Sequence, residues 1–201
     1  MKIIGLTGPS GAGKGVCSES LAALGFPCID TDSVYHELIG KPSPCTQELC
    51  SAFGKGIVDE NGAVDRKALA AIVFSDPSHQ KNELLNRITH KYVHKETLRL
   101  LEIYKKRGDK AVAVDAPLLF EASFDKMCDF CITVLAPRTL RLERIIMRDN
   151  LSKESAEARL AAQKTDDYYT SRSKYTIIND SDKEKTLDQL KCILVTEGLI
   201  S

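Results

Sequence analysis

A glycine-rich loop near the N-terminus carries the residues with the clearest chemical potential. Residues 8–15 read Gly-Pro-Ser-Gly-Ala-Gly-Lys-Gly, nearly the phosphate-binding pattern G-x-x-x-x-G-K-[ST]. An apolar run leads into this loop, and a helical pattern from Lys14 to Leu24 follows it. In that context successive backbone N–H groups point into one concavity at the positive end of a helix dipole. The spacing therefore predicts a cradle for nucleotide phosphates, with Lys14 reaching the β- and γ-phosphates.

One position of the loop departs from the pattern. Gly15 stands where a Ser or Thr hydroxyl would bind Mg²⁺, so the phosphate cradle is complete but one metal ligand is missing. A plain glycine-rich turn between a strand and a helix is the alternative that Gly15 keeps open.

Two aspartates follow or end predicted strands, at the positions where parallel sheets bind their ligands. Asp32 follows a short strand expected at residues 26–29, and Asp115 ends a buried strand at residues 111–115. Ligands of open parallel sheets bind beyond the carboxyl ends of the strands, so both aspartates should converge on the loop. There they could hold Mg²⁺, directly or through water. Either aspartate taken alone could instead cap a helix.

Arginines recur at helical spacing between residues 137 and 148. They are Arg138, Arg141, Arg144 and Arg148. Beside a phosphate-binding loop, such a stripe can clamp a phosphoryl group in transfer, and Arg144 and Arg148 are the best placed. Arg159, on the next helix, could join them from a mobile lid. A solvated basic face is the competing interpretation.

The charge balance, the apolar content and the cysteines limit the kinds of protein and of binding partner that fit this chain. The chain has 201 residues, with 28 Lys plus Arg against 28 Asp plus Glu, so no net field would gather nucleic acid or an anionic membrane. No stretch approaches the roughly 18 apolar residues of a membrane span, and the first residues lack the shape of a signal peptide. Seven scattered cysteines are typical of reduced thiols. We expect a cytoplasmic protein, monomeric or weakly self-associating, that acts on small molecules.

Two further patterns do not indicate a metal site. Cys128-x-x-Cys131 has no second cysteine pair to complete a zinc site. His90 and His94 stand four residues apart, but no catalytic Glu lies between them.

Strand and helix signals alternate along the chain. Strands are expected at residues 2–7, 26–29, 111–115, 130–135 and 175–178. Helices separate them, which indicates a parallel sheet with helices on both faces, an α/β fold. A helical stretch of about 75 residues, from about Ser33 to Arg107, looks like an insert between the second and third strands.

Capping residues and helix-terminating glycines predict where the helices begin and end. The expected helices run from Ser43-Pro44 to Gly54, from Asp65 to about Phe74, from Asp76-Pro77 with a break near Thr89-His90, from Pro137 to Arg148, from Ser152 through Gln163, and from the capping box Ser181-x-x-Glu184 to about Gly198.

These motifs, in this order, resemble the dephospho-coenzyme A kinase family almost from end to end. The resemblance rests on Gly5-Leu6-Thr7-Gly8 with Gly11-x-Gly13-Lys14, Ile29-Asp30-Thr31-Asp32, Asp65-Arg66-x-x-Leu69, His90, Asp115-x-Pro117-Leu118-Leu119-Phe120-Glu121, Arg144-x-x-x-Arg148-Asp149, Leu151-Ser152 through Arg159-x-x-x-Gln163, and Ile177-x-Asn179.

The resemblance implies a single P-loop kinase domain with a P-loop NTPase-type parallel sheet. Its core would comprise about 1–34, 108–138 and 170–201, with a helical substrate lobe at about 35–107 and a lid at about 139–169. It implies transfer of the ATP γ-phosphoryl to the ribose 3′-hydroxyl of dephospho-CoA, giving coenzyme A and ADP in the last step of CoA biosynthesis.

The resemblance also implies roles for single residues. The catalytic residues would be Asp32, Lys14 and Arg144. ATP would be bound by Gly11, Ala12, Gly13, Lys14, Gly15, Val16, Arg148 and Asn179. The acceptor would be bound by Thr7, Asp32, Arg66, His90, Leu118, Phe120 and Glu121. Asp32 and Asp115 would hold Mg²⁺. The chain departs from the family at Gly15 in place of Ser, Lys91 in place of Pro and His94 in place of a common Arg.

Three alternatives stay open at this point. The first is another small P-loop kinase, acting on a nucleoside, a nucleotide or a shikimate-like alcohol. The second is a GTPase, but the chain has no Asn-Lys-x-Asp sequence to recognise guanine. The third is a nucleotide-binding protein without turnover, which Gly15 would suit.

Overall fold

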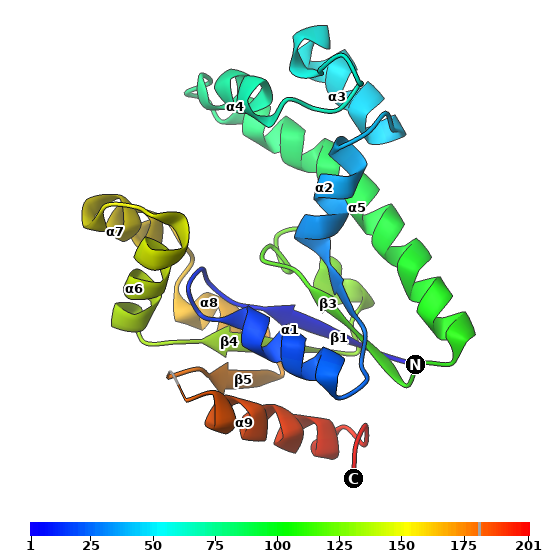
Figure 1. Ribbon diagram of the computed structural model, residues 1–201, viewed down its shortest axis with the longest axis vertical. Helices are drawn as coiled ribbons and strands as arrows, with labels where there is room; N and C mark the ends of the chain where they lie inside the picture. Colours follow the sequence, from blue (N-terminus) through cyan, green and yellow to red (C-terminus); the bar gives the residue numbers. More distant parts are fainter. Residues whose placement is uncertain (181) are drawn as a thin grey trace. The chain divides into compact units, whose positions relative to one another are not determined.

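The computed structural model describes residues 1–180 and 182–201, and the chain divides into two compact units (Figure 1). The first unit comprises Met1–Ile29 and Tyr104–Ser201, and the second comprises Asp30–Ile103.

A five-stranded sheet forms the centre of the first unit. Its strands are β1 (Lys2–Thr7), β2 (Cys28–Asp30), β3 (Ala111–Asp115), β4 (Phe130–Leu135) and β5 (Tyr175–Ile178), in the order β2-β3-β1-β4-β5. Strand β1 pairs in parallel with β3 and β4, and β4 pairs in parallel with β5. Leu6 lies opposite Asp115, and Thr7 lies opposite Thr133. The register therefore brings the loop after β1 and the aspartate of β3 to the same edge, which confirms the predicted α/β fold class.

Two helices cover one face of this sheet. Helices α1 (Lys14–Ala23) and α9 (Lys183–Thr196) bury Cys17, Leu21, Leu190 and Leu194 against Ile4 and other strand side chains (Figure 1). Apolar residues fill the strands that they cover, as expected for a sheet buried on both faces.

The opposite face is tightly packed at Gly5. A Cβ atom there would lie 2.9 Å from the sulfur of Cys131 and 3.1 Å from that of Cys128. The two cysteines thus act as small packing side chains, Cys131 buried and Cys128 half-buried. The remaining helices of this unit are η2 (Phe124–Met127), α6 (Arg138–Asp149), α7 (Lys153–Ala161) and α8 (Asp166–Thr170).

The second unit consists of helices around its own apolar core. They are α2 (Thr31–Ile39), α3 (Pro44–Phe53), η1 (Lys55–Ile57), α4 (Arg66–Phe74) and α5 (Gln80–Arg107), whose last residues belong to the first unit. The core contains Ile39, Leu49, Ile57, Leu69, Val73 and Ile88. Both predicted caps are confirmed: the Ser43 hydroxyl accepts from Thr46 N, and the Asp65 carboxylate accepts from Lys67 N.

The predicted break in the long helix is wrong. Helix α5 runs through Thr89 and His90 without interruption. The Thr89 hydroxyl donates to Leu85 O at 2.9 Å, so this polar side chain is satisfied inside the helix. Neither Gly nor Pro occurs between Gln80 and Arg107 to end it.

Other boundaries also differ from the sequence-based prediction, among them the start of α5, which is Gln80 and not Asp76-Pro77. The second strand begins at Cys28 instead of Phe26, because Phe26 N donates to Leu21 O and closes the C-terminal turn of α1. Helix α7 ends at Ala161, before Gln163, and the short helix α8 had not been predicted. Ser181, the predicted cap of the last helix, lies outside the described residues, and the carboxylate of Asp182 caps α9 by accepting from Glu184 N and Lys185 N.

Candidate active site

The glycine-rich loop joins β1 to α1 and has a conformation that only glycine adopts easily. Gly11 and Gly13 have φ angles of +81° and +86°. A Cβ at Gly11 would lie 2.6 Å from Arg141 O, and one at Gly13 would lie 2.2 Å from Asn179 Nδ2. Both glycines are therefore required twice over, by their backbone angles and by close neighbours.

Lys14 and Asp115 meet at the carboxyl edge of the sheet. Lys14 begins α1 and Asp115 ends β3, and the Lys14 Nζ lies 2.8 Å from the Asp115 Oδ1. The two side chains are only 18% and 12% exposed, so little water screens their attraction. Beneath them, burial and the nearby Asp115 raise the pKa of the Cys17 thiol to about 12, so Cys17 stays protonated. The ion pair holds the Lys14 ammonium group at the C-terminal end of the loop, where α1 begins.

Gly15 lies in the first turn of α1 and is exposed. No atom lies within 4 Å of a Cβ built there, so packing does not demand glycine. The nearby Ser18 hydroxyl donates to Gly15 O at 3.2 Å and is therefore turned towards the helix backbone. A serine would fit at position 15, and its absence is a chemical difference from the motif, not a steric necessity.

Side chains from other elements hold the outer side of the loop at Ser10. Its N–H donates to Gln163 Oε1 at 3.0 Å, and its carbonyl accepts from Arg141 Nε at 3.3 Å. Arg141 also donates to Gln163 Oε1 at 2.8 Å and is 6% exposed. The Ser10 hydroxyl accepts from Arg148 Nη2 at 3.2 Å. Sequence reasoning had not assigned Ser10 or Gln163 to the site, and no local signal links residues so far apart in the chain.

The arginine stripe of α6 faces the loop at three of its four positions. Besides Arg141 and Arg148, the guanidinium of Arg144 donates to Gly11 O at 3.1 Å and to Ala12 O at 3.3 Å. Arg138 is exposed. Three of the four arginines therefore contact the loop and do not form a purely solvated face, while their part in phosphoryl transfer stays a prediction. Arg159 pairs with Asp149, whose carboxylate also binds Arg148, so it contacts the arginine stripe through that carboxylate.

The segment after β3 brings several expected acceptor residues towards α8. Thr7 is buried, and its hydroxyl donates to Pro117 O at 3.5 Å. The Phe120 ring meets the Tyr168 ring edge-on at 6.1 Å. Burial and the neighbouring Glu121 carboxylate raise the pKa of Tyr168. Leu118 is 47% exposed, a large apolar side chain open to solvent.

The other expected site residues belong to the second unit. Asp32 lies in the first turn of α2, where its N–H donates to Asp30 Oδ1 at 2.9 Å. Asp30 is therefore the helix cap, and the carboxylate of Asp32 is not needed for that purpose. Arg66 begins α4 and is exposed, and His90 is half-buried within α5. Burial raises the pKa of Tyr35, and the nearby Arg66 partly offsets this.

Lys91, one of the departures from the family pattern, connects two helices of that unit. Its ammonium pairs with Glu48 of α3, and the Tyr92 hydroxyl donates to the same carboxylate at 2.6 Å. A proline at this position of α5 could supply neither the ammonium nor an unbroken helix.

Within residues 1–180 and 182–201, no cluster of three or more His, Cys, Asp or Glu forms a ready-made metal cage. None of the helices in the described part of the chain is long and apolar enough to cross a membrane.

The fold and this site define a class of enzyme. A parallel sheet with a glycine-rich loop after its central strand, a lysine at the start of the next helix and arginines facing the loop is the arrangement of a P-loop kinase.

Comparison with known proteins identifies the family. The family model for dephospho-CoA kinase matches residues 2–185. A dephospho-CoA kinase of Bacillus cereus is 35% identical over 198 residues, covering 98% of this chain and 98% of the relative. The crystal structure of TT1252 from Thermus thermophilus superposes with a TM-score of 0.80 at 28% identity, covering 98% and 97% of the two chains. A dephospho-CoA kinase from Campylobacter jejuni superposes with a TM-score of 0.73 at 26% identity over 100% of both.

The chain belongs to the dephospho-CoA kinase family, and it is a kinase, a phosphotransferase. This confirms the resemblance found in the sequence and favours dephospho-CoA kinase over the alternatives weighed there.

Proposed function

We propose that this chain transfers the γ-phosphoryl group of ATP to the ribose 3′-hydroxyl of dephospho-CoA, giving coenzyme A and ADP. The observation that carries the proposal is the ion pair of Lys14 with Asp115 at the end of a glycine-rich loop. It provides a positive charge and a carboxylate where a triphosphate would lie, in a chain whose family acts on this acceptor.

The loop and α6 bind ATP in this proposal. The backbone N–H groups between Gly11 and Val16 hold the phosphates, and the Lys14 ammonium neutralises the charge that develops during transfer. Arg144 supports this charge from α6, and Arg148 lies on the adenine side. Asn179 contributes to the ATP site from the outer side of the loop, where its amide donates to Ala12 O.

Asp32 orients the acceptor hydroxyl. A carboxylate with an ordinary pKa of about 4 is a weak base, but the transition state of phosphoryl transfer is loose, and proton removal can come late. Asp32 therefore needs only to hold the hydroxyl in line. Asp32 is exposed and lies in the first turn of α2, directly after β2, and its acidic side chain suits this role. The acceptor pocket would further include Thr7, Arg66, His90, Leu118, Phe120 and Glu121.

Mg²⁺ would be held by Asp115 and Asp32, directly or through water, together with phosphate oxygens. Each of these carboxylates suits the ion by its chemistry, because Mg²⁺ prefers carboxylate oxygens and keeps several waters. When bound, it would supply charge neutralisation between the β- and γ-phosphates. Gly15 offers no hydroxyl, so a water would take that position.

The proposal extends to the cellular compartment and the binding partners of the enzyme. No disulfide joins cysteines in residues 1–180 and 182–201, which suits a reducing cytoplasm. Its partners would be ATP and dephospho-CoA, with no nucleic acid or membrane involved.

A coupled ADP-release assay with a panel of acceptor alcohols tests the proposal. We expect dephospho-CoA to accelerate ADP release far above the acceptor-free background, while shikimate and adenosine do not. If dephospho-CoA stays at background while another alcohol accelerates release, the assignment of the acceptor is wrong.

A further inference from the structure

Asn179 lies behind the phosphate-binding loop, one residue beyond the end of β5. It is 2% exposed. Its backbone N–H donates to Leu135 O at 2.8 Å, which continues the pairing of β4 with β5 by one residue. The side chain of Asn179 therefore extends from a fixed point of the sheet.

The hydrogen bonds of its amide fix which end faces the loop. The Nδ2 group donates to Ala12 O at 2.9 Å. The Oδ1 atom accepts from Arg144 Nη2 at 3.4 Å and from Thr186 Oγ1 at 3.5 Å. A guanidinium can only donate and a carbonyl oxygen can only accept, so the opposite orientation of the amide would lose these bonds.

Holding Ala12 O has a consequence for the next residue. The carbonyl of Ala12 and the N–H of Gly13 belong to one peptide plane, and in a trans peptide they point in opposite directions. With Ala12 O drawn outwards to Asn179, the Gly13 N–H must point to the inner side of the loop. The same amide fills the space that a side chain at Gly13 would need, at 2.2 Å from its Cβ position.

We propose that Asn179 is a positioning residue of the phosphate-binding loop, which turns the Gly13 N–H towards the nucleotide phosphates by holding the Ala12 carbonyl. This rests on the proposed binding of ATP by the loop and adds to it. Arg144 donates to the same carbonyl at 3.3 Å and gives it a second support. Asn179 acts through the loop backbone, while its own amide is occupied by protein groups.

Two variants and a matched control test the proposal. Asn179→Ala removes the amide, and Asn179→Asp keeps its shape and its acceptor but replaces the donor with a negative oxygen facing Ala12 O. Gln189→Ala is the control, because the Gln189 amide also holds a backbone group, that of Ile178, but does not contact the loop. This amide accepts from Ile178 N at 2.9 Å and donates to Ile178 O at 3.0 Å, and Ile178 directly precedes Asn179.

The measurement is the affinity for ADP without metal, by calorimetry, alongside the affinity for dephospho-CoA and the thermal unfolding temperature. We expect Asn179→Ala to weaken ADP binding at least tenfold and Asn179→Asp to weaken it more, with dephospho-CoA affinity within twofold of the native chain. Gln189→Ala should lower the unfolding temperature but leave the affinity for ADP unchanged. If Asn179→Ala does not fold, Asn179→Asp decides the question.

Two results would overturn the proposal. One is a folded Asn179 variant that binds ADP within twofold of the native chain. The other is an equal loss of ADP and dephospho-CoA binding, since a general defect of folding would produce it. A native chain that binds no ADP would instead overturn the proposed function.

Discussion

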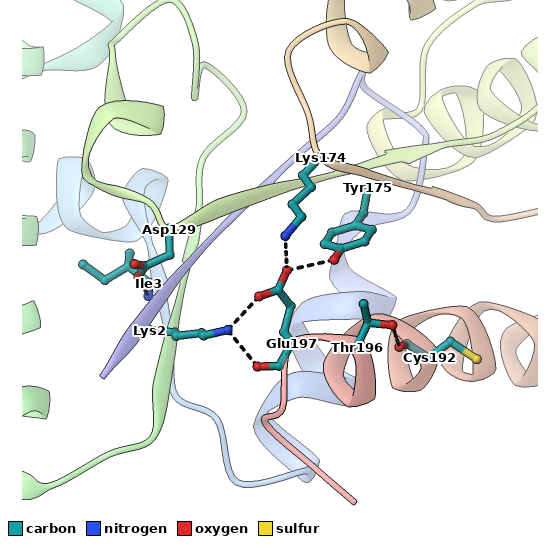
Figure 2. Close-up of polar contacts among 8 residues, drawn as sticks. All are labelled: Lys2, Ile3, Asp129, Lys174, Tyr175, Cys192, Thr196 and Glu197. Carbon is teal, nitrogen blue, oxygen red and sulfur yellow. Dashed lines mark hydrogen bonds and ion pairs between the residues drawn. The ribbon is translucent and has the colours of Figure 1, made fainter.

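Lys2 and Glu197 join the two ends of the first unit. The Lys2 Nζ lies 2.7 Å from the Glu197 Oε2 and donates to the backbone carbonyl of Glu197 at the same distance (Figure 2). The other carboxylate oxygen of Glu197 accepts from Lys174 Nζ at 2.7 Å and from the Tyr175 hydroxyl at 2.8 Å. One carboxylate, only 8% exposed, thus holds β1, β5 and the end of α9 together.

This carboxylate should make folding stability depend on acid pH. Hydrogen bonds from Lys174 and Lys2 lower the pKa of Glu197 to about 2, from an ordinary value of 4.5. A lowered pKa in the folded state means that the stabilisation is complete above about pH 5 and is lost as the pH falls towards 2. Glu197→Gln should therefore lower the free energy of unfolding by about 1–3 kcal/mol at pH 7, and by progressively less below pH 4.5.

Denaturant unfolding of both proteins between pH 2 and pH 7 measures this difference. Glu96→Gln serves as the control, because Glu96 pairs with Arg99 on the surface of one helix, where such pairs contribute about 0–1 kcal/mol. A Glu197→Gln difference that is the same at pH 3 and pH 7 would contradict the assignment.

Replacing Asp32 tests the proposed orientation of the acceptor hydroxyl. Asp32→Asn keeps the shape of the side chain but removes its charge, and we expect turnover to fall by a factor of about 10² to 10⁴. The affinity for ATP should barely change, because the phosphates bind to the loop and Lys14. Steady-state kinetics with dephospho-CoA, together with ATP binding, separate the two effects.

Asp30→Asn is the matched control for this experiment. Asp30 caps α2 two residues earlier, and asparagine caps helices about as well as aspartate. The control variant should keep near-native turnover. Near-native turnover of Asp32→Asn would leave that carboxylate without the proposed role.

Replacing Lys14 tests the charge at the end of the loop. Lys14→Met keeps the length of the side chain and removes the ammonium, so we expect turnover to fall by a factor of about 10² to 10³. Lys174→Met, in the Glu197 ion pair, provides a control cation outside the site and should leave turnover near native. Rapid-quench measurement of a single turnover checks that the phosphoryl-transfer step itself is slowed. An unchanged rate of that step would show that the Lys14 charge is not used.

The parts of this structure that were predictable from the sequence rest on local patterns. Lys14 is placed by the glycine spacing, and Asp115 by the end of an apolar strand, so their meeting follows from a parallel sheet alone. The uninterrupted path of α5 through Thr89 and His90 was not predicted, and the bond from the Thr89 hydroxyl to Leu85 O that satisfies this side chain within the helix is not evident from the sequence.

Contacts between distant residues could not be predicted from one sequence. The bond from Asn179 to Ala12 spans 167 residues, and that from Ser10 to Gln163 spans 153. An amide side chain can donate or accept almost anywhere, so its type says little about its partner. The register of β4 and β5 brings Asn179 to the loop, and the turn between α7 and α8 brings Gln163 there.

The last prediction concerns Gly15, where the chain departs from the motif of its own loop. Gly15 does not have a positive φ angle, and a Cβ there meets no atom within 4 Å, so both serine and alanine should fit. Gly15→Ala and Gly15→Ser should each stabilise the fold by up to about 1 kcal/mol, because they restrict the unfolded chain. Only serine adds a hydroxyl that can bind Mg²⁺ in place of a mobile water.

We therefore expect Gly15→Ser to be saturated at a lower Mg²⁺ concentration than the native chain, by roughly three- to tenfold, about 1 kcal/mol for one fixed ligand. Its turnover should also rise, since a fixed ligand orients the phosphates better than water. Gly15→Ala should keep the native Mg²⁺ midpoint, which separates the hydroxyl from the added volume. Equal midpoints for all three proteins would show that the hydroxyl is dispensable in this fold. A native chain without activity, restored by Gly15→Ser alone, would instead identify an inactivated kinase whose loop lacks a single oxygen atom.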